Sequence, residues 1–168
     1  MAEYAVALNF DSRGTTRLLG LMCGNYMFEN NIRPHLTLGV FKCADEREAV
    51  NAFYASAARV ERFRISFTAV GAFHGGCIFC SPAASKPLHD SYRQVYNSFL
   101  DRDLMPGADG LYTPLKWIPH AAVSYNLVSD FSDCFVYVRR MFRPFECDVT
   151  EITLVRLEPY TEIYSVEL

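Results

Sequence analysis

The order of strands and helices predicted for this chain occurs twice, and this duplication constrains the fold more than any other feature. Each half is predicted to run strand, helix, strand, helix, strand. Pro34-His35 begins the middle strand of the first half, and Pro119-His120 begins that of the second, so the histidines lie 85 residues apart (120 − 35) in a chain of 168. Residues 63–70 and 145–152 can also be aligned with their apolar positions in register. A pseudo-two-fold duplication of this kind would bring the equivalent strands and both histidines face to face.

The individual elements follow from apolar periodicity and turn residues. Strands are predicted at short apolar or alternating runs, and helices where apolar residues recur at helical spacing after a capping residue. The expected strands are 4–10, 35–41, 63–70, the segment around Ile78, 118–127, 145–157 and 163–168, and helices are expected to begin near Thr15, Asp45, Ser85 and Ser129 or Asp130. Because no linker rich in Pro, Gly or Ser separates the halves, we expect residues 1–168 to form one α+β domain. Its two pseudo-symmetric, internally duplicated lobes are expected to consist of βαβ-type modules whose antiparallel sheets line a central cleft.

Composition narrows the classes of function. Hydrophobic residues make up 51% of the chain, enough for a substantial core, and the net charge is −3. Proteins that bind extended DNA or RNA duplexes are usually basic, because neutralising phosphates drives that binding. A short nucleotide or an RNA end needs only two or three cationic contacts and is compatible with this charge. The N-terminus lacks the pattern of a signal peptide, and no apolar run reaches the roughly 20 residues of a membrane helix, so we expect a cytoplasmic protein without membrane contact.

Six cysteines are interpreted as reduced, buried thiols. Cys77 and Cys80 form a C-x-x-C pattern inside a predicted strand, where residues three apart point to opposite faces and lie about 10 Å apart. The other cysteines are scattered singly, at Cys23, Cys43, Cys134 and Cys147. With no second pair at ligand spacing, we expect core packing, no metal site and no cofactor.

The segment His35-Leu36-Thr37 places two polar side chains on one face of a strand, because positions i and i+2 share a side. Imidazole is the side chain best suited to move protons near neutral pH, and a neighbouring hydroxyl can bind the same anionic group. A lone pattern of this kind usually marks a structural histidine. The second Pro-His, at the equivalent point of the other half, favours a functional pair. By contrast, His74 at a Gly-Gly turn and His89 near a helix start are expected at the surface.

On these residues the chain resembles the 2H phosphoesterase superfamily, which includes bacterial 2′,5′ RNA ligase-like proteins and cyclic phosphodiesterases. That family carries two H-x-(T/S)-hydrophobic motifs, one per lobe, and the order of elements matches over nearly the whole chain. The first motif is intact as residues 35–38, His-Leu-Thr-Leu, and the second reads His-Ala-Ala-Val at residues 120–123. Ala122 therefore replaces the second hydroxyl. Ser124 shares its face but lies about 7 Å further along the strand.

The resemblance implies a metal-independent phosphodiesterase in which His35 and His120 form an acid/base pair and Thr37 holds a phosphate oxygen. The expected ligand is a nucleotide or RNA terminus with a 2′,3′-cyclic phosphate, bound by a monomer. Arg33 and Lys116 flank the motifs and are candidates for attracting phosphate, although charged residues of this kind are more often solvated surface residues. Tyr125 is a candidate for stacking on a base, and so is Trp117, although both fit the core equally well.

Ala122 keeps two other functions open. The chain can be a catalytically weak or inactive member that binds nucleotides or RNA ends. It can also be a structural or interaction domain that shares only the fold, because a fold does not fix a function.

Overall fold

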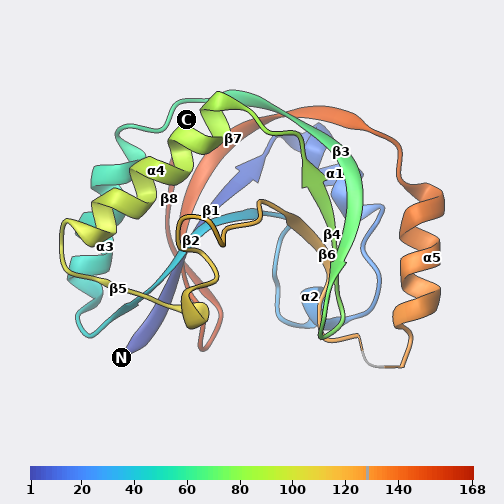
Figure 1. The fold of residues 1–168 in the computed structure, drawn as a ribbon, viewed down its shortest axis with the longest axis horizontal. Coiled ribbons are helices and arrows are strands. Elements are labelled where there is room, and N and C mark those ends of the chain that lie inside the picture. The colour runs from blue at the N-terminus through green and yellow to red at the C-terminus, as the bar shows by residue number, and fades with distance from the viewer. Residues whose placement is uncertain (128) are drawn as a thin grey trace.

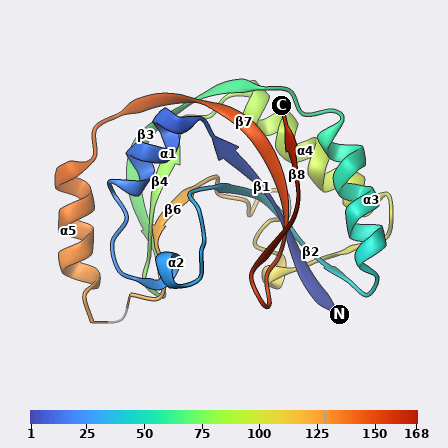
Figure 2. The same ribbon diagram turned by 180° about the vertical axis from the view of Figure 1, so that it is seen from behind.

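The computed structural model describes residues 1–127 and 129–168 and has a mixed α+β architecture (Figures 1 and 2). The elements in chain order are β1 (Ala2–Phe10), α1 (Ser12–Leu19), α2 (Tyr26–Glu29), β2 (Leu36–Cys43), α3 (Glu46–Ala57), β3 (Phe63–Phe73), β4 (Cys77–Pro82), α4 (Lys86–Leu100), β5 (Met105–Pro106), the 3-10 turn η1 (Ala108–Gly110), β6 (Ala121–Ser124), α5 (Phe131–Met141), β7 (Phe145–Arg156) and β8 (Thr161–Glu167). The α+β class and the twofold order of strands and helices are confirmed, with α2, β5 and η1 as additions. No helix in the described part of the chain is long and apolar enough to cross a membrane.

The long strand β7 joins two antiparallel groups of strands. Its first residues, from Phe145 to Val149, pair with β3, and the rest, up to Arg156, pair with β1. One group is therefore β8, β7, β1 and β2, and the other is β7, β3, β4 and β6. Within each group the strand that follows a Pro-His lies beside a central strand, β2 beside β1 and β6 beside β4. This equivalence supports the expected duplication, and we infer that residues 1–168 form one domain of two pseudo-symmetric lobes.

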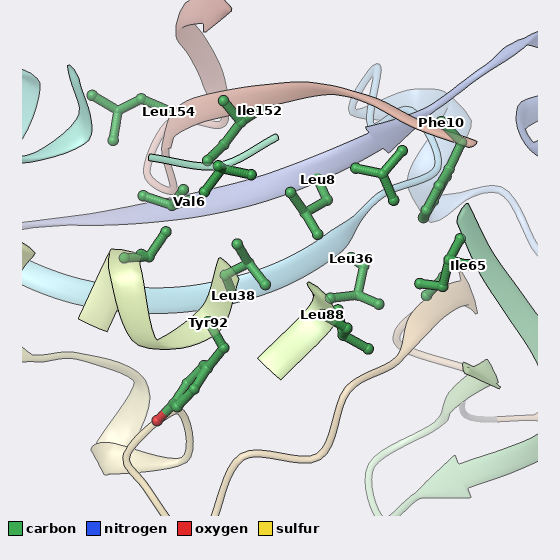
Figure 3. Close-up of a cluster of buried hydrophobic side chains, with 14 of the residues drawn as sticks. Val6, Leu8, Phe10, Leu36, Leu38, Ile65, Leu88, Tyr92, Ile152 and Leu154 are labelled. Carbon is green, nitrogen blue, oxygen red and sulfur yellow. The ribbon is translucent and has the colours of Figure 1, made fainter. Parts of the chain in front are cut away.

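Side chains alternate between the two faces of each strand. One face of the sheet packs against the helices and forms the core, and the opposite face is called the inner face. Helices α3 and α4 cover the outside of the lobe that contains β2, and α1 and α5 lie on the outside of the other (Figure 1). Val6 and Leu8 of β1, with Leu36 of β2, are fully buried toward this helical side, where Leu88 of α4 packs (Figure 3). Burying such a side chain contributes about 1.5–3 kcal/mol. The intervening positions of β1 carry small residues, and they leave space on the opposite face.

Two of the element boundaries that differ from the sequence prediction have a clear physical cause. Helix α1 begins at Ser12 rather than near Thr15, because the Asp11 carboxylate accepts a hydrogen bond from Gly14 N at 2.7 Å and caps the helix earlier. The strand predicted over 118–127 is limited to β6. Asn126 ends the extended conformation with a φ of 54°, in the left-handed region.

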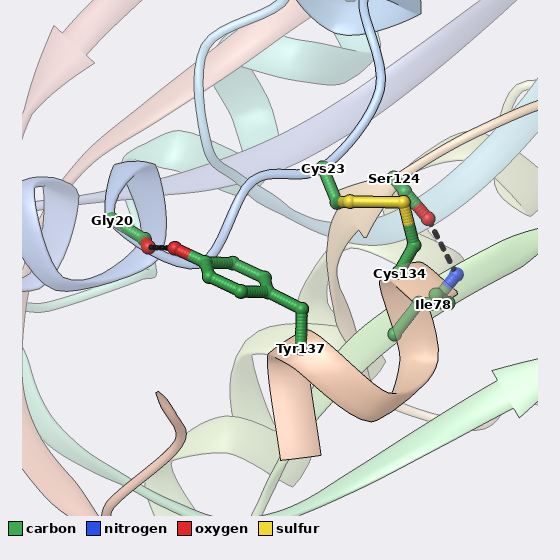
Figure 4. The surroundings of a disulfide bond; sticks show 6 residues. All are labelled: Gly20, Cys23, Ile78, Ser124, Cys134 and Tyr137. Atoms are coloured by element: carbon green, nitrogen blue, oxygen red, sulfur yellow. Dashed lines mark hydrogen bonds between the residues drawn. A yellow bond between two sulfur atoms is a disulfide. The ribbon is translucent and has the colours of Figure 1, made fainter. Parts of the chain in front are cut away.

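The interpretation of all six cysteines as reduced thiols is wrong for two of them. Cys23 and Cys134 form a disulfide with a Cα–Cα distance of 5.8 Å, although 111 residues separate them (Figure 4). Cys23 reaches α5 because its backbone N donates to the carbonyl of Val123 in β6, a contact that sequence spacing does not reveal. Disulfides are rare in the cytosol, so this bond bears on the expected cytoplasmic location, which stays a prediction.

Cys77 and Cys80 lie in β4 as buried free thiols, as predicted. Burial raises the pKa of the Cys77 thiol to about 11 and that of Cys80 to about 12. Thiols with such pKa values are almost entirely protonated at neutral pH and poorly reactive. Cys43 and Cys147 are buried and free as well.

Candidate functional site

The two histidine motifs meet where β2 pairs with β6. Leu36 lies opposite Ala121 in this antiparallel pair, and both side chains are fully buried on the core side. Continuing the register by one residue each way places Thr37 opposite His120 and His35 opposite Ala122, all on the other face. Diagonal neighbours in such a pair are about 7–8 Å apart, which is the spacing expected between the two histidines. The pseudo-two-fold axis therefore passes between the motifs, as the duplication predicts.

Both imidazole rings are held in the same way by the main chain. His35 Nδ1 lies 2.9 Å from the carbonyl oxygen of Arg33, and His120 Nδ1 lies 2.7 Å from that of Ile118. Because a carbonyl can only accept, each neutral ring carries its proton on Nδ1. Nε2 of each ring therefore keeps its lone pair and can take a proton from a reacting group.

The pKa values of both histidines are lowered. Burial, which disfavours the charged imidazolium, is the main cause for each, and the hydrogen bond to the backbone carbonyl partly offsets it. The charge of His35 also lowers the pKa of His120, so the two rings are near enough to interact electrostatically. At neutral pH the neutral, proton-accepting form of each ring is favoured.

The surroundings of the two rings differ in kind. The ring of His120 contacts Phe73 and Phe79, with centroid distances of 4.9 and 5.2 Å. His35 lies near the charges of Glu162 and Arg33, of which the first raises its pKa and the second lowers it. One ring therefore sits in an aromatic setting and the other beside an ion-pair network.

A cavity of about 530 Å³ opens beside His35 and Thr37, within the size range of small-molecule sites. Its floor consists of small and aliphatic side chains of the inner sheet face, among them Ala5, Val40 and Val155. Four tyrosines also line it, namely Tyr26, Tyr112, Tyr125 and Tyr160. The cavity thus combines an apolar floor with hydroxyl groups next to one of the histidine motifs.

Of the residues predicted from the sequence to form the site, the cavity brings together His35, Thr37 and Tyr125, and the strand register adds His120. Arg33 and Lys116 are not among the lining residues. The Arg33 guanidinium forms ion pairs with Glu151 and with Glu162, the latter at 2.7 Å. Lys116 is exposed. A direct role for either cation in phosphate binding stays a prediction.

Trp117 belongs to the core rather than to the cavity. Its ring stacks on Tyr92, with centroids 4.2 Å apart and planes at 10°, and its Nε1 donates to the carbonyl of Thr37 at 3.1 Å. Ser124 is also committed elsewhere, because its hydroxyl accepts a hydrogen bond from Ile78 N at 3.1 Å (Figure 4). This agrees with the inference that Ser124 does not replace the hydroxyl missing at Ala122. His74 and His89 are exposed, as predicted.

Three of the cavity tyrosines, Tyr26, Tyr112 and Tyr160, were not singled out by the sequence. They come from separate segments with no shared motif, so only the fold shows that they converge. Within residues 1–127 and 129–168, no group of three His, Cys, Asp or Glu side chains is arranged to hold a metal ion.

Known structures resemble the chain over nearly its whole length. A phosphoesterase crystal structure gives a TM-score of 0.67 at 11% identity, covering 99% of this chain and 98% of the other. E. coli LigT complexed with 3′-AMP gives 0.64 at 10%, covering 99% and 97%, and the MHV ns2 PDE domain gives 0.58 at 11%, covering 93% and 99%. At these identities the likeness shows the fold alone.

Sequence comparison identifies the family. No curated protein sequence matches the chain. A model of the 2′-5′ RNA ligase superfamily matches residues 25–160, a region that contains both histidine motifs and most of the residues that line the cavity. With the antiparallel α+β fold and the paired motifs, this match shows that the chain belongs to the 2′-5′ RNA ligase superfamily of 2H phosphoesterases.

Proposed function

We propose that this protein is a monomeric, metal-independent phosphodiesterase that acts on 2′,3′-cyclic phosphates of nucleotides or RNA ends. Its superfamily and fold support a phosphodiesterase-type activity. The observation that carries the finer proposal is the matched pair of imidazoles, each fixed through Nδ1 to a backbone carbonyl. Two rings prepared in this way, and electrostatically coupled, are suited to proton transfer on both sides of one phosphate.

The reaction uses one histidine as a base and the other as an acid. The neutral ring takes a proton from water through Nε2 as the water oxygen bonds to phosphorus. The bond from phosphorus to one ribose oxygen breaks, and the protonated ring donates its Nε2 proton to that oxygen. The product is an open phosphate monoester with a free ribose hydroxyl. The pair finishes with its protonation states exchanged, and transfer through solvent resets it.

Thr37 and the cavity tyrosines provide neutral donors around this centre. Extending the β2–β6 register by one residue pairs Thr37 with His120, and Thr37 also lines the cavity beside His35, which supports a role for its hydroxyl at both rings. We propose that it donates to a non-bridging phosphate oxygen, where charge builds up in the transition state. Tyr125, which lines the same cavity, is proposed to contact the nucleoside.

The test is hydrolysis of adenosine 2′,3′-cyclic phosphate by the purified chain and by His35→Ala and His120→Ala. Removal of a general acid or base costs about 10²–10⁴-fold in rate, and each variant is expected to lose that much in kcat/KM. His74→Ala, at an exposed turn outside the cavity, is the matched control and is expected to keep the wild-type rate. Circular dichroism checks that each variant is folded. Wild-type rates in either His35→Ala or His120→Ala would refute the two-histidine mechanism.

A second candidate is a nucleotide or RNA-end binding protein with little or no catalysis, and the alanine at position 122 favours it. Ala122 lies opposite His35 in the register and is buried against Cys77 and Phe79. If the wild type hydrolyses no cyclic phosphate but binds a nucleoside 2′-phosphate, the binding function is preferred. Increased turnover in Ala122→Thr or the smaller Ala122→Ser would instead indicate a handicapped enzyme. No activity in any of the three forms favours the binder.

A further inference from the structure

The charges around the cavity limit the ligand that it can hold. Among the described residues, the side chains that line it include no lysine and no arginine. Within residues 1–127 and 129–168, the acidic side chains that line it are Glu3 and Glu158. Among the described side chains that line the cavity, His35 is the one that can become positively charged, and burial disfavours its charged form.

The nearest cations are occupied by other partners. Arg33, two residues before His35, is neutralised by Glu151 and Glu162, so its charge is not free to meet a phosphate. Lys42 Nζ lies 3.6 Å from Glu3 Oε1, and this ion pair compensates the charge of the Glu3 carboxylate. Glu158 takes part in none of the ion pairs formed within residues 1–127 and 129–168. Glu158 is exposed, and its carboxylate therefore adds a solvated negative charge, without an ion-pair partner among the described residues, to the lining of the cavity.

The tyrosines do not change this balance, because they stay neutral. Burial raises the pKa of Tyr160 to about 12, and it also raises the pKa values of Tyr112 and Tyr125. A hydrogen bond with Thr37 partly opposes the rise for Tyr112. At neutral pH these phenols can donate hydrogen bonds and stack on a base, but they cannot neutralise an anion.

From this balance we propose that the cavity selects a nucleoside cyclic phosphate that carries one negative charge and discriminates against ligands with a second phosphate group. A cyclic phosphodiester has a single charge, which one imidazolium can balance. A phosphate monoester adds about −1.5 to −2 at neutral pH, and that charge would meet Glu158 without a compensating cation. The proposal rests on the phosphodiesterase function above and narrows its substrates to mononucleosides without a 5′-phosphate.

The experiment compares adenosine 2′,3′-cyclic phosphate with the same compound bearing a 5′-phosphate. Because Glu158 is exposed, we expect kcat/KM for the 5′-phosphorylated compound to be about 3- to 10-fold lower at low salt, and the difference to become smaller as salt screens the repulsion. Glu158→Gln is expected to reduce the ratio between the two substrates. Glu167→Gln, an exposed carboxylate of β8 outside the cavity, is the matched control and is expected to keep it.

A variant with an added positive charge at the cavity also tests the proposed charge selectivity. Asn30 is exposed at the cavity rim, and Asn30→Lys is expected to raise kcat/KM for the 5′-phosphorylated compound relative to the unmodified one. Equal rates on both compounds in the wild type, or a preference for the 5′-phosphorylated one, overturn the charge selectivity and leave the phosphodiesterase proposal standing.

If neither compound is hydrolysed, the proposed catalysis fails, and calorimetric titration of both compounds decides the selectivity alone. Weaker binding of the 5′-phosphorylated compound then supports it, and equal or tighter binding refutes it.

Discussion

The ring of His35 is bordered by charged side chains, whereas the ring of His120 is bordered by aromatic ones. The lobe of His35 includes the network of Arg33 with Glu151 and Glu162. The lobe of His120 presents Phe73 and Phe79 to the ring. The main-chain anchoring of both imidazoles is nevertheless the same. The duplication has thus kept the part of the motif that orients a proton carrier and has let the supporting interactions diverge.

The largest expected effect comes from the crosslink that only the lobe of His120 contains. Replacing both Cys23 and Cys134 by serine is expected to lower the free energy of unfolding by about 2–4 kcal/mol, because a disulfide that closes a long loop restricts the unfolded chain. Urea denaturation monitored by circular dichroism measures it. Reductant is expected to destabilise the wild type but not the double variant. Equal midpoints for the wild type with and without reductant would show that the crosslink contributes nothing.

The next largest effect is expected at Thr37, whose hydroxyl is proposed to donate a hydrogen bond to the phosphate. Thr37→Ala removes a hydrogen bond to a charged group, worth about 1.5–3 kcal/mol, and is expected to lower kcat/KM by about 10- to 150-fold. Thr37→Ser keeps the hydroxyl and serves as the control, with most of the rate retained. If Thr37→Ala and Thr37→Ser are equally impaired, packing rather than hydrogen bonding explains the loss.

The pH dependence of kcat/KM tests how the pKa of each histidine contributes to the rate. In the proposed mechanism the active form has one protonated and one neutral histidine. Both pKa values are lowered from 6.5, so the maximum is expected below pH 6.5. As pH rises above it, the protonated acid is lost, and the rate falls by at most about tenfold per pH unit. Glu162→Gln removes a carboxylate that raises the pKa of His35 and is expected to move the maximum to lower pH. Glu146 is an exposed carboxylate of β7 that does not line the cavity, and Glu146→Gln is expected to leave the pH maximum unchanged. A maximum well above pH 7 would contradict the assignment.

The smallest effect concerns the ion pairs of Arg33. Arg33→Gln is expected to lower the free energy of unfolding by about 1 kcal/mol, because its side chain is partly exposed and such pairs are screened by water. Lys116→Gln, at an exposed position, is expected to change stability by less than about 0.5 kcal/mol. Thermal denaturation compares the two. Loss of substrate binding in Arg33→Gln with unchanged stability would instead make Arg33 a ligand of the phosphate.

Local patterns predicted much of this fold. The stripe of apolar residues on α4, with Leu88 and Val95 fully buried, and the Asp45 cap of α3 both follow from short-range chemistry. The histidine pair followed from the repeat and its spacing, since a duplicated unit tends to pack symmetrically.

Long-range partners could not be predicted in the same way. From the sequence, Thr37 was assigned to His35 as its neighbour along the strand. Extending the observed pairing of Leu36 with Ala121 by one residue also puts Thr37 across from His120. The sequence makes Arg33 a candidate for attracting phosphate, which stays a prediction, but it does not reveal the contacts of Arg33 with Thr153 and Glu162, which lie 120 and 129 residues away. No local pattern encodes such contacts, and the same holds for the convergence of the four cavity tyrosines.

The disulfide between Cys23 and Cys134 also determines whether the fragments stay joined after the backbone between these residues is cleaved. Both His35 and His120 lie within the covalent loop that it closes. A protease that cuts the exposed connection between α4 and β6, near Leu115, would divide the chain into two segments, with His35 on the first and His120 on the second. In the oxidised protein these segments stay joined as one covalent molecule, whereas the reduced protein retains only noncovalent contacts between them. The crosslink thus keeps His35 and His120 in one covalent molecule even when the polypeptide between them is cut.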